Sequence, residues 1–383
     1  PSASRAWSEN VTSLTIYSAG TFILNASAAL RARSRKAYRF SPVVPAVVPI
    51  IVSMTPMSVG MAMAVLHGSG FACRATLAVR SSAVEPTSGQ PETQPPVTRR
   101  FEGVGGVTLV GERRGDPADP AVVFLHGGGQ TRHSWGRTAA AVAERGWCAW
   151  TLDARGHGES DWAPDGDYRL ASFAGDVVRV MGAIGGRPPI VGASLGGLTA
   201  LMLMGSVAPG AASGLVLVDI VPKMETKGTD RIRTFMEDRM FDGFGSLEEV
   251  ADAVAAYNPH RERPTDLEGL RKNLRERDGR FYWHWDPDFI RSQPDRGPAE
   301  VADHDTMMDH ALAITEPMML VRGRMSDVVS AEGAREFLEA VPTARFVDVG
   351  EAGHMVAGDP NDAFTDAVVA FLDGLGTRGD LDT

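Results

Sequence analysis

Short apolar runs alternate with helix-like patterns through most of the chain after residue 96. Runs that are apolar at every position are typical of parallel strands buried between two layers of helices. The sequence therefore predicts an α/β fold with a mostly parallel central sheet and helices on both faces. The expected strands are residues 121–125, 148–152, 189–192, 214–218, 318–321 and 345–349, and the expected helices are residues 135–145, 170–184, 195–206 and about 361–375.

The first part of the chain has a different composition. Up to Val84 the only acidic residue is Glu9, against eight bases, so this segment carries +7 in a chain whose formal net charge is −10. Residues 84–96 are rich in Pro, Gln, Glu and Thr and are typical of a linker. We therefore expect residues 1–97 to be an extension that is disordered or not native to the fold.

This extension also has features of a targeting segment. A basic cluster from Arg31 to Arg39 precedes an uncharged run over residues 41–66, which is the arrangement of a signal peptide or membrane anchor. Four prolines interrupt the run, which disfavours a continuous helix. The chain has only two cysteines, Cys73 and Cys148, so no disulfide framework is indicated. We expect a cytoplasmic protein, with export or anchoring left open.

The strongest functional signal is a G-x-S-x-G pattern around Ser194. Gly192 closes an expected strand and Leu195 opens an expected helix, so the sharp turn between them exposes the serine hydroxyl above the sheet. Gly192 and Gly196 leave room for the tight backbone and for substrate. The pattern predicts that Ser194 is a nucleophile; the alternative is a turn whose serine only caps the helix.

A run of glycines follows the expected strand at residues 121–125, in the order His126-Gly127-Gly128-Gly129. Negative charge that develops on a carbonyl oxygen needs donors fixed in advance, and backbone N–H groups serve where no side chain blocks them. We therefore predict an oxyanion hole formed by the N–H groups of Gly128 and Leu195. The alternative is a flexible turn without a catalytic role.

A serine nucleophile requires a base and an acid that orients the base. His354 lies just past the last expected strand, where a loop can return to the catalytic edge, and it is the predicted base. The acid should precede the histidine along the chain. Asp327, in a Gly-x-x-x-Asp loop after the strand at 318–321, is our prediction, and Asp219 is its rival.

Taken together, these motifs resemble the α/β-hydrolase superfamily from about Thr98 to Leu375. The resemblance implies the α/β-hydrolase fold, and within the superfamily the pattern is similar to small bacterial esterases and to the cofactor-free haloperoxidase or perhydrolase-like group. Haloalkane dehalogenases and epoxide hydrolases place Asp at the nucleophile position, so Ser194 argues against both reactions. The motifs HGGG, D-x-RGHG-x-S, G-x-S-x-G-G, G-x-x-x-D and GH begin at His126, Asp153, Gly192, Gly323 and Gly353.

Residues 222–308 lose the strand–helix alternation and resemble the helical cap that the superfamily inserts into its core. We therefore divide the rest of the chain into a core of residues 98–221 and 309–377 and a helical cap of residues 222–308. Substrate pockets are mostly apolar, so a few large side chains should line one, although most should simply pack the cap onto the sheet. The expected pocket residues are Trp135, Phe235, Trp283 and Trp285.

These features predict a serine hydrolase that cleaves a carboxylic ester of an apolar or aromatic substrate through an acyl-enzyme. Perhydrolase or haloperoxidase-like activity and C–C bond hydrolysis use the same triad and remain alternatives, and a non-catalytic small-ligand receptor is a third. No metal or nucleotide site emerges, so no cofactor is expected and the partner is a small-molecule substrate. The net charge of −10 argues against nucleic acid. We expect no membrane binding, and the oligomeric state stays open.

Overall fold

The computed structural model describes residues 12–14, 63–67, 74–78, 95–259, 262–291, 303–350, 353–354 and 362–375. The chain divides into two units, Pro1–Glu92 and Thr93–Thr383. In the first unit, the strands β1 (Thr12–Leu14), β2 (Met63–His67) and β3 (Arg74–Ala78) form an antiparallel sheet in the order β1-β3-β2. The rest of the predicted extension, including most of its uncharged run, lies outside the described residues.

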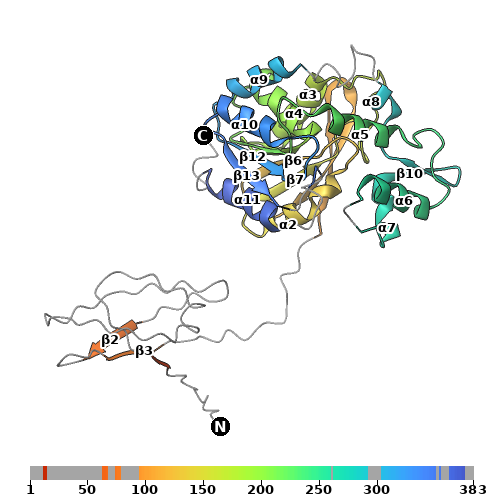
Figure 1. The fold of residues 1–383 in the computed structure, drawn as a ribbon. Coiled ribbons are helices and arrows are strands. Elements are labelled where there is room, and N and C mark those ends of the chain that lie inside the picture. Colours follow the sequence, from red (N-terminus) through yellow and green to blue (C-terminus); the bar gives the residue numbers. More distant parts are fainter. Residues whose placement is uncertain are drawn as a thin grey trace, which may run out of the picture. The chain divides into compact units, whose positions relative to one another are not determined.

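An eight-stranded sheet forms the centre of the second unit (Figure 1), in the order β13-β12-β9-β8-β6-β7-β5-β4. At one end of the sheet, the edge strand β4 (Val97–Glu102) is antiparallel to its neighbour β5 (Thr108–Arg114), and β5 is antiparallel to β7. All other neighbours are parallel. The mostly parallel sheet is confirmed. Its parallel strands are β6 (Ala121–Leu125), β7 (Cys148–Leu152), β8 (Ile190–Ala193), β9 (Leu215–Val218), β12 (Met318–Gly323) and β13 (Arg345–Val349).

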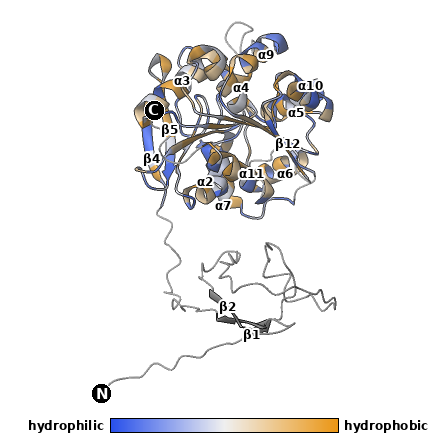
Figure 2. Cartoon of the chain, turned by 90° about the vertical axis from the view of Figure 1, so that its left-hand side faces the viewer, coloured by the Kyte–Doolittle hydropathy of each residue, from blue (hydrophilic) through white to orange (hydrophobic). Residues whose placement is uncertain are grey.

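Helices cover both faces of this sheet (Figures 1 and 2), and its central strands β6, β8 and β9 are apolar between them. Successive side chains of a strand point to opposite faces, so a strand between two layers must be apolar at every position. In β6, Val123 and Leu125 pack in one core cluster while Val122 and Phe124 pack in the other. One layer contains α3 (Leu170–Ile184), α4 (Leu195–Met202), α9 (His304–Ala313) and α10 (Ala331–Ala340), and the other contains α2 (Gly136–Ala143) and α11 (Asp362–Asp373).

The cap differs from the expected purely helical insertion because it contains a β-hairpin. Strands β10 (Leu274–Arg277) and β11 (Arg280–Trp283) pair across Asp278 and Gly279, which both have positive φ angles. An Asp-Gly pair is a strong local signal for such a hairpin turn. The cap helices are α5 (Thr226–Glu237), α6 (Leu247–Tyr257), α7 (Leu267–Leu270) and α8 (Pro287–Arg291). Because α9 packs against α4, the core resumes near residue 304 rather than at 309.

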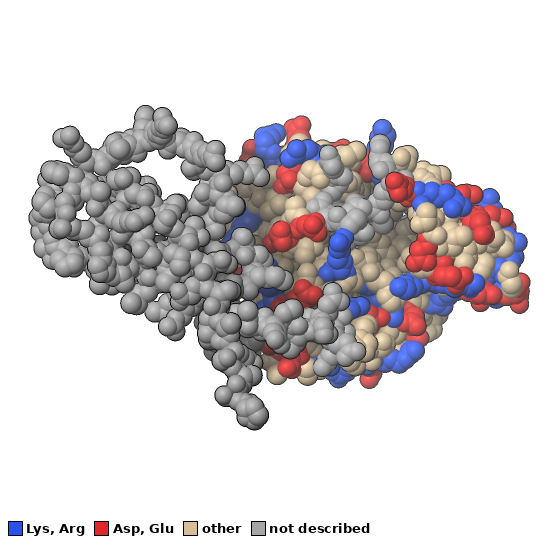
Figure 3. Space-filling view, turned by 90° about the horizontal axis from the view of Figure 1, so that it is seen from below, with Lys and Arg blue, Asp and Glu red and all other residues tan. Residues whose placement is uncertain are grey.

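The surface of the second unit carries charges of both signs. In Figure 3, Lys and Arg side chains are interspersed with Asp and Glu side chains over the visible face, including the cap at the right. Within the described residues, none of the helices combines the length and the apolar character needed to cross a bilayer.

Removing residues 1–92 should leave the second unit folded, because its sheet begins only at β4. We expect a chain starting at Thr93 to keep its melting temperature within about 2 °C of the full chain, which corresponds to less than about 1 kcal/mol. A chain starting at Gly103 is the matched comparison. It lacks β4, leaves β5 without its outer partner and should melt at a clearly lower temperature. An unfolded Thr93 chain, measured by circular dichroism, would contradict this division.

Candidate active site

Ser194 occupies the sharp turn between β8 and α4. Its backbone has φ 47° and ψ −115°, a conformation that a residue with a side chain adopts only under constraint. The flanking glycines show the constraint: a Cβ on Gly192 would lie 2.5 Å from the Gly196 carbonyl oxygen, and a Cβ on Gly196 would lie 2.3 Å from that of Leu125. Packing between strand and helix therefore requires both glycines and holds Ser194 at the carboxyl end of β8.

Half-buried His354 contacts the fully buried Asp219, which follows β9, the strand beside β8. His354 Nδ1 lies 2.7 Å from Asp219 Oδ2. Because a carboxylate only accepts, Nδ1 carries the hydrogen and Nε2 keeps its lone pair, as a general base requires. Asp219 is 0% exposed, and its oxygens also accept from the Gly323 N–H (2.9 Å) and the Ser326 hydroxyl (2.5 Å). These donors offset the desolvation of the carboxylate and fix the histidine.

The prediction that Asp327 orients the histidine is wrong in this structure. Asp327 pairs with Arg231 of α5, at 2.8 Å from Nε and 3.0 Å from Nη2, and its side chain is 32% exposed. The loop after β12 instead contacts Asp219, because its Gly323 N–H and its Ser326 hydroxyl donate to that carboxylate. Asp219 and Asp327 follow the neighbouring strands β9 and β12. Both precede His354 along the chain, so chain order alone did not distinguish them.

The three residues meet at the carboxyl edge of the sheet. Ser194 follows β8, Asp219 follows β9, and His354 follows β13. Among the described residues no hydrogen bond joins Ser194 to His354. In a substrate-free site the link between nucleophile and base is commonly long and tightens when substrate binds.

The predicted oxyanion loop is a tight turn over residues 127–130, whose Gln130 N–H donates to the Gly127 oxygen at 3.1 Å. The Ala154 N–H donates to His126 Nε2 (3.0 Å), so His126 Nδ1 carries the hydrogen and donates to the Gly127 oxygen (2.8 Å). In a trans peptide the N–H points away from the C=O, so holding this oxygen fixes the direction of the Gly128 N–H. A Cβ on Gly127 would lie 3.2 Å from that of Ser194, which places the loop beside the nucleophile.

A buried ion pair between Arg132 and Asp153 connects this loop to the turn after β7. The Arg132 N–H donates to Asp153 Oδ1 at 2.7 Å, and the Arg132 guanidinium bonds the same carboxylate and Glu159. Asp153 is fully buried, and removing one partner of such a pair is strongly destabilising. The carboxylate also accepts from the Glu159 N–H at 3.0 Å, so it ties its own turn to the oxyanion loop. The D-x-RGHG-x-S stretch therefore works as architecture here.

Three buried histidines lie behind the same loop but do not form a metal site. The ring centroids of His126 and His157 are 5.2 Å apart, and those of His157 and His284 are 5.7 Å apart. Burial lowers the pKa of His126 to about 4 and that of His157 to about 3, so both rings are neutral near pH 7. Both nitrogens of His126 and of His284 bond to the backbone. Within the described residues, no three His, Cys, Asp or Glu side chains are arranged to hold a metal ion.

Trp135 does not line the site, contrary to the prediction. It is fully buried in the layer under α2 and α11, with its ring centroid 5.3 Å from Phe124 and 6.2 Å from Phe364. The residue ends a short turn after the oxyanion loop, and its large apolar surface packs into the core on the face covered by these two helices. Proximity in sequence to the loop was therefore a misleading signal.

The aromatic residues predicted in the cap pack on one another. The Trp283 and Trp285 rings are stacked with centroids 5.0 Å apart, and Phe235 lies 5.3 Å from Trp283. The indole N–H groups donate to the backbone oxygens of Asp238 (3.1 Å) and Met236 (3.3 Å). These contacts build the core of the cap, and a pocket role for the three residues stays a prediction.

Two apolar side chains of the cap contact the oxyanion loop directly. A Cβ on Gly129 would lie 3.2 Å from Met236 Cε, and a Cβ on Gly128 would lie 3.7 Å from the Phe289 ring. Phe289 was missed because no sequence period marks the short α8, whereas Met236 was only one of many large side chains in the cap. Both are buried, so the surface facing the predicted oxyanion donors is apolar.

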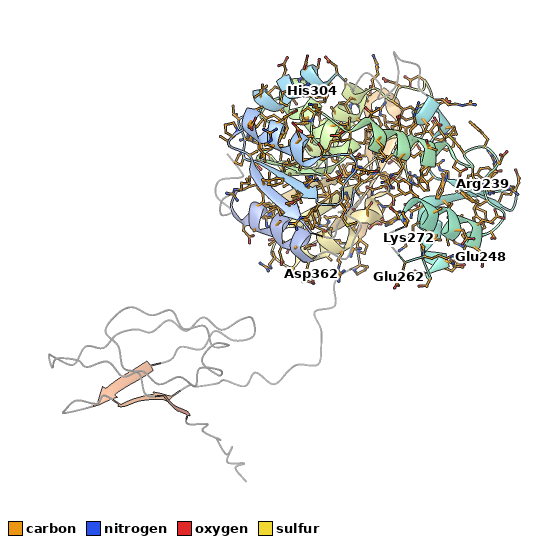
Figure 4. All side chains as sticks on the ribbon, viewed as in Figure 1. Arg239, Glu248, Glu262, Lys272, His304 and Asp362 are labelled. Atoms are coloured by element: carbon orange, nitrogen blue, oxygen red, sulfur yellow. The ribbon has the colours of Figure 1, made fainter. Side chains whose placement is uncertain are left out.

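Several charged side chains of the cap lie on its outer side, whereas Arg231 and Arg275 bond to the core. In Figure 4, Arg239, Glu248 and Glu262 project from the outer margin of the cap, away from the sheet. The described cap thus has an aromatic interior, and its outer margin carries charged side chains.

The tight packing of the nucleophile turn can be tested with Gly196→Ala. The added methyl group would meet the backbone of β6, and overpacking of this kind costs about 1–3 kcal/mol. Gly182 in α3 is the matched control, because a Cβ there meets nothing within 4 Å and Gly→Ala in a helix stabilises by about 0.5–1 kcal/mol. Urea unfolding should give opposite signs for the two variants. Equal stability of Gly196→Ala and wild type would refute the close approach.

Comparisons with known proteins agree with this geometry. Residues 120–359 match the family model described as alpha/beta hydrolase fold. The chain is 32% identical to the esterase Rv0045c of Mycobacterium tuberculosis over 265 residues, covering 66% of this chain and 83% of that protein. It is 30% identical to the sn-1-specific diacylglycerol lipase ABHD11 of Mus musculus, covering 67% and 82%. A solved structure of the mycobacterial esterase superimposes with a TM-score of 0.59 at 30% identity, covering 73% of this chain and 92% of that chain. The chain belongs to the α/β-hydrolase family and resembles its esterases.

Proposed function

We propose that the chain is a serine esterase that cleaves carboxylic esters through an acyl-enzyme, with Ser194 as nucleophile, His354 as base and Asp219 as acid. The observation that carries the proposal is the 2.7 Å contact between His354 Nδ1 and the buried carboxylate of Asp219. It holds the imidazole in the tautomer that a general base needs. A structural histidine on a surface loop would not require a fully buried carboxylate that accepts three hydrogen bonds.

The geometry supports the following steps. The Ser194 hydroxyl adds to the ester carbonyl while its proton passes to His354 Nε2. The negative charge on the former carbonyl oxygen is stabilised by the Gly128 N–H and by the Leu195 N–H, the first of α4, which has no partner within the helix. His354 then gives the proton to the leaving alcohol, and water repeats the sequence on the acyl-enzyme.

We further propose that the substrate carries an apolar or aromatic group near the scissile bond. Met236 and Phe289 face the oxyanion loop, and the described part of this wall offers carbon and sulfur rather than charge. The names of two relatives, an esterase and a diacylglycerol lipase, support an ester with an apolar portion. A small-molecule substrate and a cytoplasmic location complete the proposal, the latter on the low cysteine content.

Ser194→Ala should abolish ester hydrolysis while the protein stays folded, because it removes the nucleophile and adds no bulk. Loss of a triad member typically lowers kcat by about 10⁴-fold or more. The measurement is a screen of nitrophenyl esters of graded acyl length, with a parallel arm containing peroxide to detect perhydrolysis. A fluorophosphonate probe should label wild type once and the variant not at all. Near-normal ester turnover by Ser194→Ala would refute the assignment of Ser194 as the nucleophile.

Asp219→Asn should reduce kcat far more than Asp327→Asn. Asparagine at the acid position keeps the size but favours the wrong histidine tautomer, which lowers kcat by about 10⁴-fold in a comparable triad. Asp327→Asn loses only a partly exposed ion pair with Arg231, so we expect a change of less than about threefold. Circular dichroism on both variants excludes unfolding. The reverse ranking would restore Asp327 as the acid.

A further inference from the structure

A third buried histidine, His284, connects the cap to the oxyanion loop. It follows β11 directly and is 1% exposed. The Gly158 N–H donates to His284 Nδ1 at 2.7 Å, so the ring hydrogen is on Nε2, which donates to the Gly129 oxygen at 3.3 Å. Burial lowers the pKa of His284 well below its ordinary value, which keeps the ring neutral, and the Gly158 N–H at Nδ1 fixes the tautomer.

The Gly129 oxygen is the start of a chain of hydrogen-bonded peptides. The Gly129 C=O and the Gln130 N–H belong to one peptide unit. The N–H of this unit donates to the Gly127 oxygen at 3.1 Å. The Gly127 oxygen in turn belongs to the peptide unit whose N–H is that of Gly128. Each unit thus accepts at its C=O and donates at its N–H, from His284 to the predicted oxyanion donor. Bonds in such chains polarise one another and strengthen along the chain.

We propose that His284 is a positioning residue for ester hydrolysis, which orients and polarises the Gly128 N–H through the turn at residues 127–130. This inference rests on the proposed function of Ser194 and on the oxyanion role of Gly128. It makes the cap a part of the catalytic machinery in addition to a cover, because one cap side chain completes the support of the oxyanion loop.

A purely structural role for His284 makes a different prediction. The cap segment at residues 284–286 also docks on the core through the Asp286 N–H, which donates to the Gly156 oxygen at 2.9 Å, and through the Tyr168 hydroxyl, which donates to Asp286 Oδ2 at 2.5 Å. If His284 served only this docking, weakening a different docking contact would have the same effect on catalysis.

Two substitutions separate the two contacts of His284. Asn places an amide oxygen near the position of Nδ1, so His284→Asn keeps the acceptor for Gly158 and loses the donor to Gly129. Gln places an amide nitrogen near the position of Nε2, so His284→Gln keeps the donor and loses the acceptor. Tyr168→Phe is the matched control, because it weakens docking at Asp286 without touching the oxyanion loop.

The test measures kcat, KM and melting temperature of the full chain with the best nitrophenyl ester, and the inhibition constant of a trifluoromethyl ketone analogue, whose serine adduct places an oxyanion in the hole. For His284→Asn we expect kcat to fall about tenfold with KM changed less than about threefold, since removing an oxyanion donor outright costs about 10²–10³-fold. The inhibition constant should rise by the factor by which kcat/KM falls. His284→Gln should recover most of kcat and melt at a lower temperature, and Tyr168→Phe should lower only the melting temperature.

Several results would overturn the inference. They are an unchanged kcat in His284→Asn, an equal loss of kcat in Tyr168→Phe, or an inhibition constant that does not follow kcat/KM. Should His284→Asn not fold, a tenfold loss of kcat in a folded His284→Gln would overturn it as well. A wild-type protein that hydrolyses no ester would instead overturn the proposed function, and the role of His284 with it.

Discussion

Asp219 places a carboxylate where water does not reach, and this charge determines how the loops at the carboxyl edge of the sheet come together. An isolated buried carboxylate costs several kcal/mol, so it persists only with donors around it. These donors come from the loop after β12, through Gly323 and Ser326, and from the segment after β13, through His354. One buried group therefore fixes two loops that the sheet alone would leave free, and in doing so it orients the predicted base.

On the side of the oxyanion loop, a buried ion pair fixes the loops in the way that Asp219 fixes them on the other side of the site. Arg132 and Asp153 are buried together and tie the oxyanion loop to the turn after β7. His126 adds a neutral contact to the Gly127 oxygen. Each side of the candidate site is thus held by a buried polar group that bonds to backbone and side-chain donors of the surrounding loops, and such networks are rigid when every member is satisfied.

Much of the fold followed from the local sequence. The strands at residues 121–125 and 148–152 have the bounds that their apolar runs predicted, because a strand between two helix layers has no polar face. The strand at residues 345–349 also has its predicted bounds, although it lies at an edge of the sheet and contains Arg345 and Asp348. The nucleophile turn was equally local, since Gly192 and Gly196 are required by contacts within a few residues and with one neighbouring strand. The hairpin of the cap is likewise signalled locally, by Asp278 and Gly279, whose positive φ angles form its turn.

The sequence by itself determined the class of fold, the position of Ser194 and the candidate histidine, because each depends on a pattern within one strand, one turn or one loop. Only the tertiary structure decided which carboxylate meets His354, where Trp135 packs, and that Met236, His284 and Phe289 reach the oxyanion loop. Those outcomes depend on which of two neighbouring loops turns inward, on which core cluster Trp135 joins, and on how an insertion docks. They are set by apolar packing and by hydrogen bonds between residues as many as 155 positions apart, which no local pattern encodes.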